Sequence, residues 1–255
     1  MKLRGKAALV TGGVRGIGWE IVHAYRLEGA RIAICDLLEP EVGAAVARLE
    51  LPEQDVLGLK ADVSLERDVV AMFQRVRERF GRLDILVNNA GFAWPRSGPL
   101  DLEVAETPFE VWLKILHTNL TGAFLCSRES LRIMRTQKYG SIINISSPQG
   151  KKGKALRGPY CAAKFGVEGL TQVMALENST YNIRVNALDP GGIVATEAIK
   201  RIARNRGMKM LRPDVVRACA VYLASDESAA VTGQSLVAPE WNREHGIEVP
   251  YTVVS

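Results

Sequence analysis

The sequence predicts an α/β fold: one domain over residues 1–255, built on a doubly wound parallel sheet of about seven strands with helices on both faces, in three layers. Short β-branched or apolar runs alternate with stretches whose apolar residues recur with helical spacing. The runs are almost continuously apolar, as in strands that are buried on both faces. The composition, 47% hydrophobic and 24% charged, is that of a globular chain, and no segment resembles a linker.

The expected elements follow in order along the chain. We expect strands at 7–10, 31–35, 56–59, 85–88, 141–145, 183–188 and 235–237. We expect helices at 19–27, 39–49, 65–80, 109–135 and 165–176. Parallel strands with right-handed crossovers bring their carboxyl ends to one edge, and ligands bind beyond that edge near a switch in strand order. Residues that directly follow a strand are therefore the candidates for a site.

Two segments account for the net charge of +5. Ten Lys and Arg residues lie in 151–157 and 200–212. The rest of the chain has 23 basic and 28 acidic residues, so it is acidic overall. No apolar run approaches the roughly 18 residues of a membrane span, so we expect a cytoplasmic protein that binds no membrane. The four cysteines lie far apart without nearby histidines, so we expect neither a metal site nor a disulfide framework.

A glycine-rich turn follows the first expected strand and precedes a helix, the order found in Rossmann-like dinucleotide-binding units. Glycines let a pyrophosphate approach the amide groups at the helix N-terminus, where the helix dipole favours an anion. The spacing, G-x-x-x-G-x-G, differs from the longer G-x-G-x-x-G fingerprint, and a simple turn explains it equally well. The candidate cofactor residues here are Gly12, Arg15, Gly16, Ile17 and Gly18.

Acidic residues follow the second and third strands. Asp36 stands 18 residues after Gly18, where a carboxylate can accept the ribose hydroxyls and repel a 2′-phosphate. This position favours NAD over NADP, although Asp36 could instead cap the next helix and Arg15 could soften the preference. Asp62, with Val63, could accept from the adenine amino group or could form a turn.

The segment Asn88-Asn89-Ala90-Gly91 follows the fourth strand. Its Asn89, Ala90 and Gly91 are candidates to supply amides and a flat wall at the switch in strand order, or simply to form a turn.

Tyr160 and Lys164 lie at i and i+4, on one face of a helix. A phenol has a pKa near 10 and needs a nearby ammonium to act as a base at neutral pH. Ser147, 13 residues earlier and just past the fifth strand, could hold the reacting oxygen, with Ser146 as its neighbour in register. Asn119, inside a helix, would usually face solvent unless it bends the helix around a bound water. Alone, a Tyr-x-x-x-Lys pair usually marks only a solvated helix face.

Together these motifs resemble the short-chain dehydrogenase/reductase family over residues 5 to about 238. The matching motifs, in family order, are Thr11-Gly12-x-x-x-Gly16-x-Gly18, Asn88-Asn89-Ala90-Gly91, Asn119, Ser147, Tyr160-x-x-x-Lys164, Arg184-Val185-Asn186 and Pro190-Gly191.

The resemblance implies a role for each of these residues. Tyr160 is the general acid/base, and Ser147 polarises the carbonyl. Lys164 binds the nicotinamide ribose and lowers the pKa of Tyr160. Asn119 holds a water of the proton relay. Pro190, Gly191 and Ile193 meet the nicotinamide carboxamide. The resemblance also implies a homotetramer or a dimer.

Four features depart from the family pattern. Ala195 occupies the slot usually held by a threonine, and Thr196 stands one residue later. Residues 92–111, which include Trp94, Pro95, Arg96 and Pro99, form an extended connection. The substrate lid, 197–212, is short, and the tail 239–255 is atypical. Both basic segments fall where the family builds its cleft, so Arg157 with Ser147 and Gln149 are candidates to bind a substrate, which we expect to be anionic. The alternative is that the basic segments are only solvated faces.

Three classes of function remain open. The first is an NAD-dependent dehydrogenase for a secondary alcohol or ketone, with a small polar substrate such as a sugar, a polyol or a hydroxy acid. The second is an NADPH-dependent 3-oxoacyl-carrier-protein reductase, for which the basic surface suits an acidic carrier but Asp36 does not suit NADPH. The third is a non-catalytic dinucleotide-sensing or scaffold protein. We expect no nucleic-acid partner, because the basic residues gather at the expected cleft.

Overall fold

The computed structural model describes residues 1–93, 102–197, 199–200 and 208–254. Within them, seven parallel strands form one sheet in the order β3-β2-β1-β4-β5-β6-β8, with the switch in order between β1 and β4. The strands are β1 (Ala7–Thr11), β2 (Arg31–Asp36), β3 (Val56–Lys60), β4 (Ile85–Asn88), β5 (Gly140–Ile145), β6 (Ile183–Asp189) and β8 (Ser235–Val237). The predicted strands and the predicted parallel sheet are confirmed.

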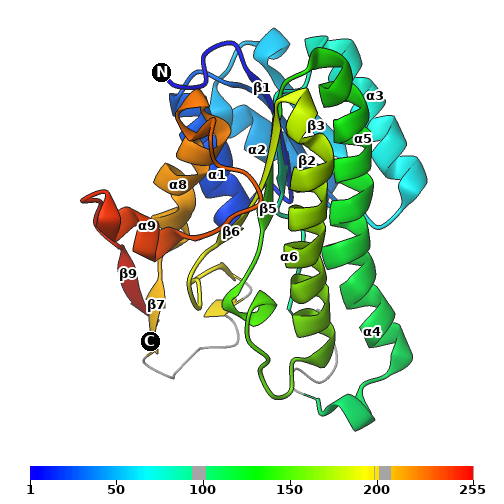
Figure 1. Ribbon diagram of the computed structural model, residues 1–255, viewed down its shortest axis with the longest axis vertical. Helices are drawn as coiled ribbons and strands as arrows, with labels where there is room; N and C mark the ends of the chain where they lie inside the picture. Colours follow the sequence, from blue (N-terminus) through cyan, green and yellow to red (C-terminus); the bar gives the residue numbers. More distant parts are fainter. Residues whose placement is uncertain (94–101, 198, 201–207, 255) are drawn as a thin grey trace.

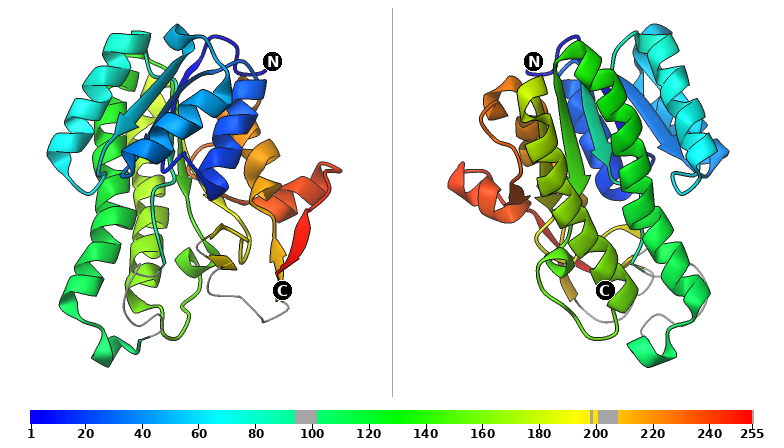
Figure 2. Two further views of the ribbon diagram at one scale, coloured as in Figure 1. Left: turned by 180° about the vertical axis from the view of Figure 1, so that it is seen from behind. Right: turned by 45° about the vertical axis from the view of Figure 1, so that its right-hand side comes forward.

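Helices cover both faces of this sheet (Figures 1 and 2). One face carries α1 (Gly16–Leu27), α2 (Glu39–Leu49) and α8 (Arg217–Ala224), and the other carries α3 (Glu66–Phe80), α5 (Gly122–Gln137) and α6 (Gly158–Asn178). Strand residues alternate between the two apolar cores: in β1, Ala8 and Val10 face the α1 side, whereas Ala7 and Leu9 face the α3 side. The three-layer prediction is confirmed.

The helix predicted at 109–135 is interrupted. It consists of α4 (Phe109–Leu116), a π-helical turn (His117–Thr121) and α5. Such π-bulges are rare and often lie at functional sites. The helical periodicity of residues 109–135 did not predict this interruption.

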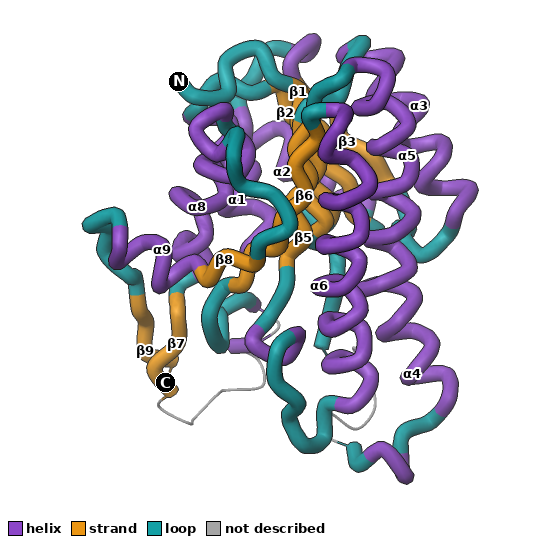
Figure 3. The backbone as a smooth tube through the Cα atoms, viewed as in Figure 1, coloured by secondary structure: helices purple, strands orange, loops and turns teal. Residues whose placement is uncertain are grey.

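The sequence did not predict a second, two-stranded antiparallel sheet, which lies apart from the main one (Figure 3). It pairs β7 (Met208–Leu211), from the predicted lid, with β9 (Tyr251–Val254), from the predicted tail. Helix α9 (Ala238–Glu244) lies between the main sheet and β9 along the chain. Lid and tail therefore form one unit. Residues 94–101, 198, 201–207 and 255, and with them Trp94, Pro95, Arg96, Pro99, Arg201, Arg204 and Arg206, lie outside the described residues.

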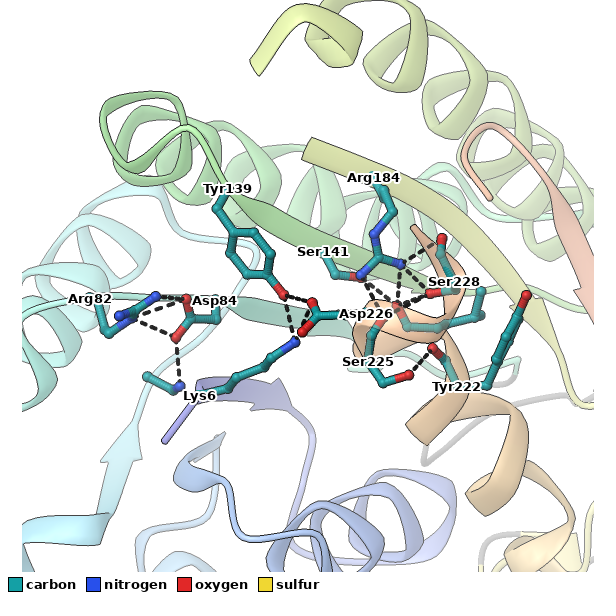
Figure 4. A network of polar contacts seen from close by, with 12 residues as sticks. Lys6, Arg82, Asp84, Tyr139, Ser141, Arg184, Tyr222, Ser225, Asp226 and Ser228 are labelled. Atoms are coloured by element: carbon teal, nitrogen blue, oxygen red, sulfur yellow. Dashed lines mark hydrogen bonds and ion pairs between the residues drawn. The ribbon is translucent and has the colours of Figure 1, made fainter. Parts of the chain in front are cut away.

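A polar network ties the strands together at the edge where they begin (Figure 4). The buried Arg184 guanidinium donates to carbonyl oxygens of Leu223 and Ser225, at 2.7 and 3.0 Å. Lys6 forms an ion pair with Asp226 at 2.8 Å. This network stabilises the edge opposite the candidate site. No helix among the described residues combines the length and the hydropathy needed to cross a membrane.

Candidate functional site

The glycine turn after β1 is too tightly closed for any larger residue at its last position. A Cβ on Gly18 would lie 2.2 Å from the Gly12 carbonyl oxygen and 2.4 Å from Asn89 Nδ2. Gly12 and Gly16 have φ of +62° and +55°, which L side chains rarely adopt. These glycines are therefore required by the backbone of the turn itself.

Asn89 and Ala90 hold this turn in place across the β1–β4 switch. Thr11 Oγ1 accepts the backbone N–H groups of Asn89 and Ala90, both at 3.0 Å. The Asn89 amide donates to the carbonyl oxygens of Thr11 and Gly12, both at 2.9 Å. Hydrogen bonds thus join the segment after β4 to the glycine turn that was predicted to bind phosphate. Through these bonds Asn89 holds the shape of that turn.

The N-terminus of α1 suits an anionic ligand. Its cap residue, Arg15, makes no side-chain cap, and the first turn contains no acidic residue. Helices α2 and α3 each carry two acidic residues in their first turns. Ile17 packs against the core below the turn. Free amides at the positive end of the helix dipole fit a pyrophosphate.

Two residues were expected near the adenosine ribose, Asp36 and Arg15, and they differ in their partners. Asp36 is half-buried and accepts the Leu37 N–H at 2.8 Å. It does not cap α2, whose cap residue is Leu38 and makes no side-chain hydrogen bond, so the alternative of a helix cap is wrong. Arg15 is bound by both oxygens of Glu41, at 3.0 and 2.8 Å. The cation that could have met a 2′-phosphate is thus already paired.

The two residues expected near the adenine, Asp62 and Val63, make contacts within the protein. Asp62 Oδ1 accepts the N–H and the hydroxyl of Ser64, at 2.9 and 2.6 Å, and so forms the turn that precedes α3. Val63 is buried against Gly122. A contact with the adenine amino group stays a prediction for Asp62.

Asn119 lies in the π-helical turn and is buried, with 3% of its surface exposed, so it does not face solvent. Its amide group donates to the carbonyl oxygens of Phe92 and Ile115, both at 2.9 Å. Its Oδ1 has no hydrogen-bond partner among the described residues and lies against Gly91, where a Cβ would approach to 2.4 Å. An unpaired buried oxygen here suits a water or a ligand.

The two serines after β5 have different partners. Ser146 donates its hydroxyl to Glu168 and so is turned toward α6. Ser147 is buried and accepts the Gln149 N–H at 3.2 Å, and its hydroxyl lies near enough to that of Tyr160 to lower the Tyr160 pKa. The structure therefore places Ser147, and not Ser146, beside Tyr160.

Tyr160 and Lys164 lie on one face of α6, as predicted from their spacing. Burial of its hydroxyl raises the pKa of Tyr160 to about 12; the neighbouring Ser147 hydroxyl and the charge of Arg157 oppose this shift. Burial lowers the pKa of Lys164 to about 8. Lys164 Nζ donates to the Ile145 carbonyl at 2.6 Å and lies 5.6 Å from the centroid of the Tyr160 ring. A lowering of the Tyr160 pKa by Lys164 thus stays a prediction.

The turn after β6 contacts the glycine turn. Gly191 has φ of +80°, and a Cβ there would lie 2.6 Å from Pro239. Ile193 is 44% exposed, and its carbonyl accepts the Leu211 N–H at 2.9 Å. Thr196, one residue beyond the family slot, lies where a Cβ on Gly16 would meet its Cγ2 at 3.1 Å. Pro190 is buried at the start of this turn.

Three of the described basic residues in the two basic segments form ion pairs with carboxylates. Lys151 forms an ion pair with the buried Asp189 at 3.3 Å, and Lys200 pairs with Glu197 at 3.0 Å. Arg212 pairs with Asp214 at 2.6 Å. These partners weaken the argument for an anionic substrate among the described cations.

Two further features near the site could contact a substrate: the side chain of Gln149 and an apolar pocket. Gln149 Oε1 is buried without a partner in the described part of the chain. Arg157 is the N-cap residue of α6 and directly precedes Gly158, which lines an apolar pocket of about 310 Å³. The pocket is lined by Val104, Thr107, Phe109, Trp112, Gly158 and Pro159.

Two carboxylates near Lys164 were not predicted from the sequence. Glu168, four residues after Lys164 on α6, accepts the hydroxyls of Ser146 and Ser235. Asp189 ends β6 directly before Pro190 and is 2% exposed. Its place at a strand end was the available signal, because buried strand ends face the ligand edge of the sheet. Among the described residues, no group of three His, Cys, Asp or Glu could hold a metal ion.

Comparison with known proteins identifies the family of the chain and several similar proteins. The sequence model of the short chain dehydrogenase family matches residues 6–207. L-fucose dehydrogenase of Bos taurus is 38% identical over 248 residues, which cover 91% of this chain and 87% of the relative. Cis-4-hydroxycyclohexanecarboxylate dehydrogenase of Sinomonas cyclohexanicum is 34% identical over 239 residues, 91% of this chain and 94% of the relative. The crystal structure of levodione reductase is similar with a TM-score of 0.84 at 28% identity, over 93% of this chain and 98% of that one.

Proposed function

The chain belongs to the short-chain dehydrogenase family, and from this premise we propose that it transfers hydride between NAD and the carbinol carbon of a small polar secondary alcohol. One observation carries the proposal. Ser147 lies near Tyr160 at the carboxyl end of β5, and Lys164, one turn after Tyr160 on α6, donates to the Ile145 carbonyl. This arrangement joins a proton carrier, a hydrogen-bond partner for the reacting oxygen and a positive charge.

Three features favour a dinucleotide, and NAD over NADP. The uncapped N-terminus of α1 would hold the pyrophosphate, and Asp36 would accept the ribose hydroxyls. Glu41 neutralises Arg15, so a 2′-phosphate would meet a carboxylate without a free cation from the turn. When bound, the nicotinamide supplies or takes up the hydride.

The protein's own residues would manage the proton. Tyr160 would take the proton of the substrate hydroxyl during oxidation and return it during reduction, while Ser147 donates to the reacting oxygen. Because the Tyr160 pKa is raised, the rate of alcohol oxidation should increase with pH. Lys164 would bind the nicotinamide ribose, and the unpaired Asn119 Oδ1 would hold a water that passes the proton to solvent.

The substrate class rests on the polar residues Gln149 and Arg157, on the apolar pocket and on the relatives. Gln149 Oε1 can accept a substrate hydroxyl, and Arg157 stands at the start of α6 for a polar or carboxylate group. The apolar pocket at Gly158 and Pro159 would receive the hydrocarbon side of the substrate. The relatives named for a sugar and for a hydroxy acid fit a sugar, a polyol or a hydroxy acid here.

The test is a panel of polyols, sugars, sugar acids and hydroxy acids with NAD and with NADP, read as formation of the reduced cofactor. We expect turnover with NAD, a loss of about 10²-fold or more in Tyr160→Phe, and retained cofactor binding in that variant. Glu41→Gln should release Arg15 and improve the use of NADP relative to NAD. A preference for NADPH with acyl-carrier substrates would instead indicate the carrier-protein reductase. Cofactor binding without any turnover would indicate the scaffold.

A further inference from the structure

Asp189 is a buried carboxylate that the proposed reaction does not yet use. It ends β6, and 2% of its surface is exposed. Its Oδ1 accepts the Gly191 N–H at 2.8 Å, and its Oδ2 meets Lys151 Nζ at 3.3 Å. A buried charge is stable only when it is paired and hydrogen-bonded, and this carboxylate is both.

These two contacts join two walls of the site. Lys151 directly follows the short 3₁₀ helix Pro148–Gly150 and so belongs to the segment that begins with Ser147. Gly191 belongs to the turn that would meet the nicotinamide, and its φ of +80° and its closeness to Pro239 leave this turn little freedom. Asp189 therefore fixes the Ser147 segment against a rigid turn.

Asp189 also acts on the charges of α6. Its carboxylate raises the pKa of Lys164 and that of Tyr160. Glu168 adds to the effect on Lys164, while Arg157 lowers the pKa of Tyr160. Burial raises the pKa of Asp189 itself, and the Gly191 N–H and Lys151 oppose this. The positive charge of Lys151 thus partly offsets the negative charge of Asp189 near Tyr160 and Lys164.

We propose that Asp189 is a positioning residue for proton transfer: paired with Lys151, it holds the Ser147 segment against the Pro190–Gly191 turn and places a negative charge within electrostatic range of Tyr160 and Lys164. This role rests on the proposed function. It predicts opposite electrostatic effects for the two members of the pair.

The test compares pH profiles of alcohol oxidation. Asp189→Asn keeps an acceptor for Gly191 but removes the negative charge, so the acidic limb of kcat should move down by about one pH unit. Lys151→Met removes the balancing positive charge, so the limb should move up. Lys151→Arg keeps the charge and should restore the original profile. The double variant Asp189→Asn/Lys151→Met should return close to it.

The same shifts should appear without turnover. The ionisation of Tyr160, followed by phenolate absorbance as the difference between each protein and its Tyr160→Phe counterpart, should move down in Asp189→Asn and up in Lys151→Met. This readout tests Asp189 even if no alcohol is oxidised, in which case the proposed function alone fails.

A control pair separates charge from fold. Lys2 and Glu227 form an exposed ion pair at 2.8 Å near the N-terminus. Lys2→Met and Glu227→Gln should leave both profiles unchanged. Shifts of the same sign in Asp189→Asn and Lys151→Met, or unchanged profiles together with lower unfolding temperatures, would overturn the proposal and leave the pair a purely structural contact.

Discussion

Replacing Gly18 with alanine should open the glycine turn and weaken both the fold and dinucleotide binding. The added Cβ would stand 2.2 Å from the Gly12 carbonyl oxygen, whereas ordinary contacts begin at 3.4 Å, so the turn must yield by about 1.2 Å. Overpacking of this kind costs about 1–3 kcal/mol in the free energy of unfolding. At about 2–4 °C per kcal/mol for a chain of this size, the unfolding temperature should fall by about 2–12 °C.

The assay is a thermal melt together with a titration of NAD followed by tryptophan fluorescence. Because Gly12 would line the phosphate site, the Kd for NAD should rise about tenfold or more. Gly43 is the matched control: it lies exposed inside α2, and a Cβ there meets nothing within 4 Å. Gly43→Ala should therefore stabilise the protein, by about 0.5–1 kcal/mol, and leave the Kd unchanged. If Gly18→Ala melts and binds NAD as the original protein does, the reasoning from the turn is refuted.

Three further predictions follow from buried groups. Lys164→Met should raise the free energy of unfolding by about 1–2 kcal/mol at neutral pH, since it removes a buried amine whose pKa is lowered from 10.5 to about 8 and loses one hydrogen bond. Melts against pH should show this gain fully below pH 8 and vanishing as the pH rises toward 10.5, because the unfolded chain binds the extra proton between these values. Ser147→Ala should lower kcat about 10²-fold while Ser146→Ala leaves it unchanged; steady-state kinetics that reverse the two would contradict the assignment. Arg184→Met leaves buried carbonyls unpaired and should cost about 3 kcal/mol, lowering the unfolding temperature by about 6–12 °C without changing KM, because it lies at the opposite edge of the sheet.

Much of the fold and the candidate site follows from local sequence. Continuous apolar runs marked the seven strands, because a strand buried on both faces tolerates few polar residues. The spacing of Tyr160 and Lys164 fixed their common helix face. Burial of Asn119 was not evident, since an asparagine inside a helix usually faces solvent.

Other features depended on residues far apart in the chain. The pairing of β7 with β9 joins the lid to the tail, and about forty residues of chain separate the two strands, so no local pattern predicts it. The contact of Thr196 with Gly16 shows that one inserted residue did not remove it from the glycine turn. The pairing of Arg15 with Glu41 likewise joins residues of two different elements, and a role of Arg15 at the ribose stays a prediction.

The sequence by itself determined the doubly wound sheet, the glycine turn and the order of the candidate proton-transfer residues, because periodicity and turn chemistry act over a few residues. Only the tertiary structure decided which of the two serines faces Tyr160 and which cations are already paired. It also decided that Asp189 joins the two walls of the site. Ion pairs and buried hydrogen bonds depend on which segments the topology brings together, and that information is not local.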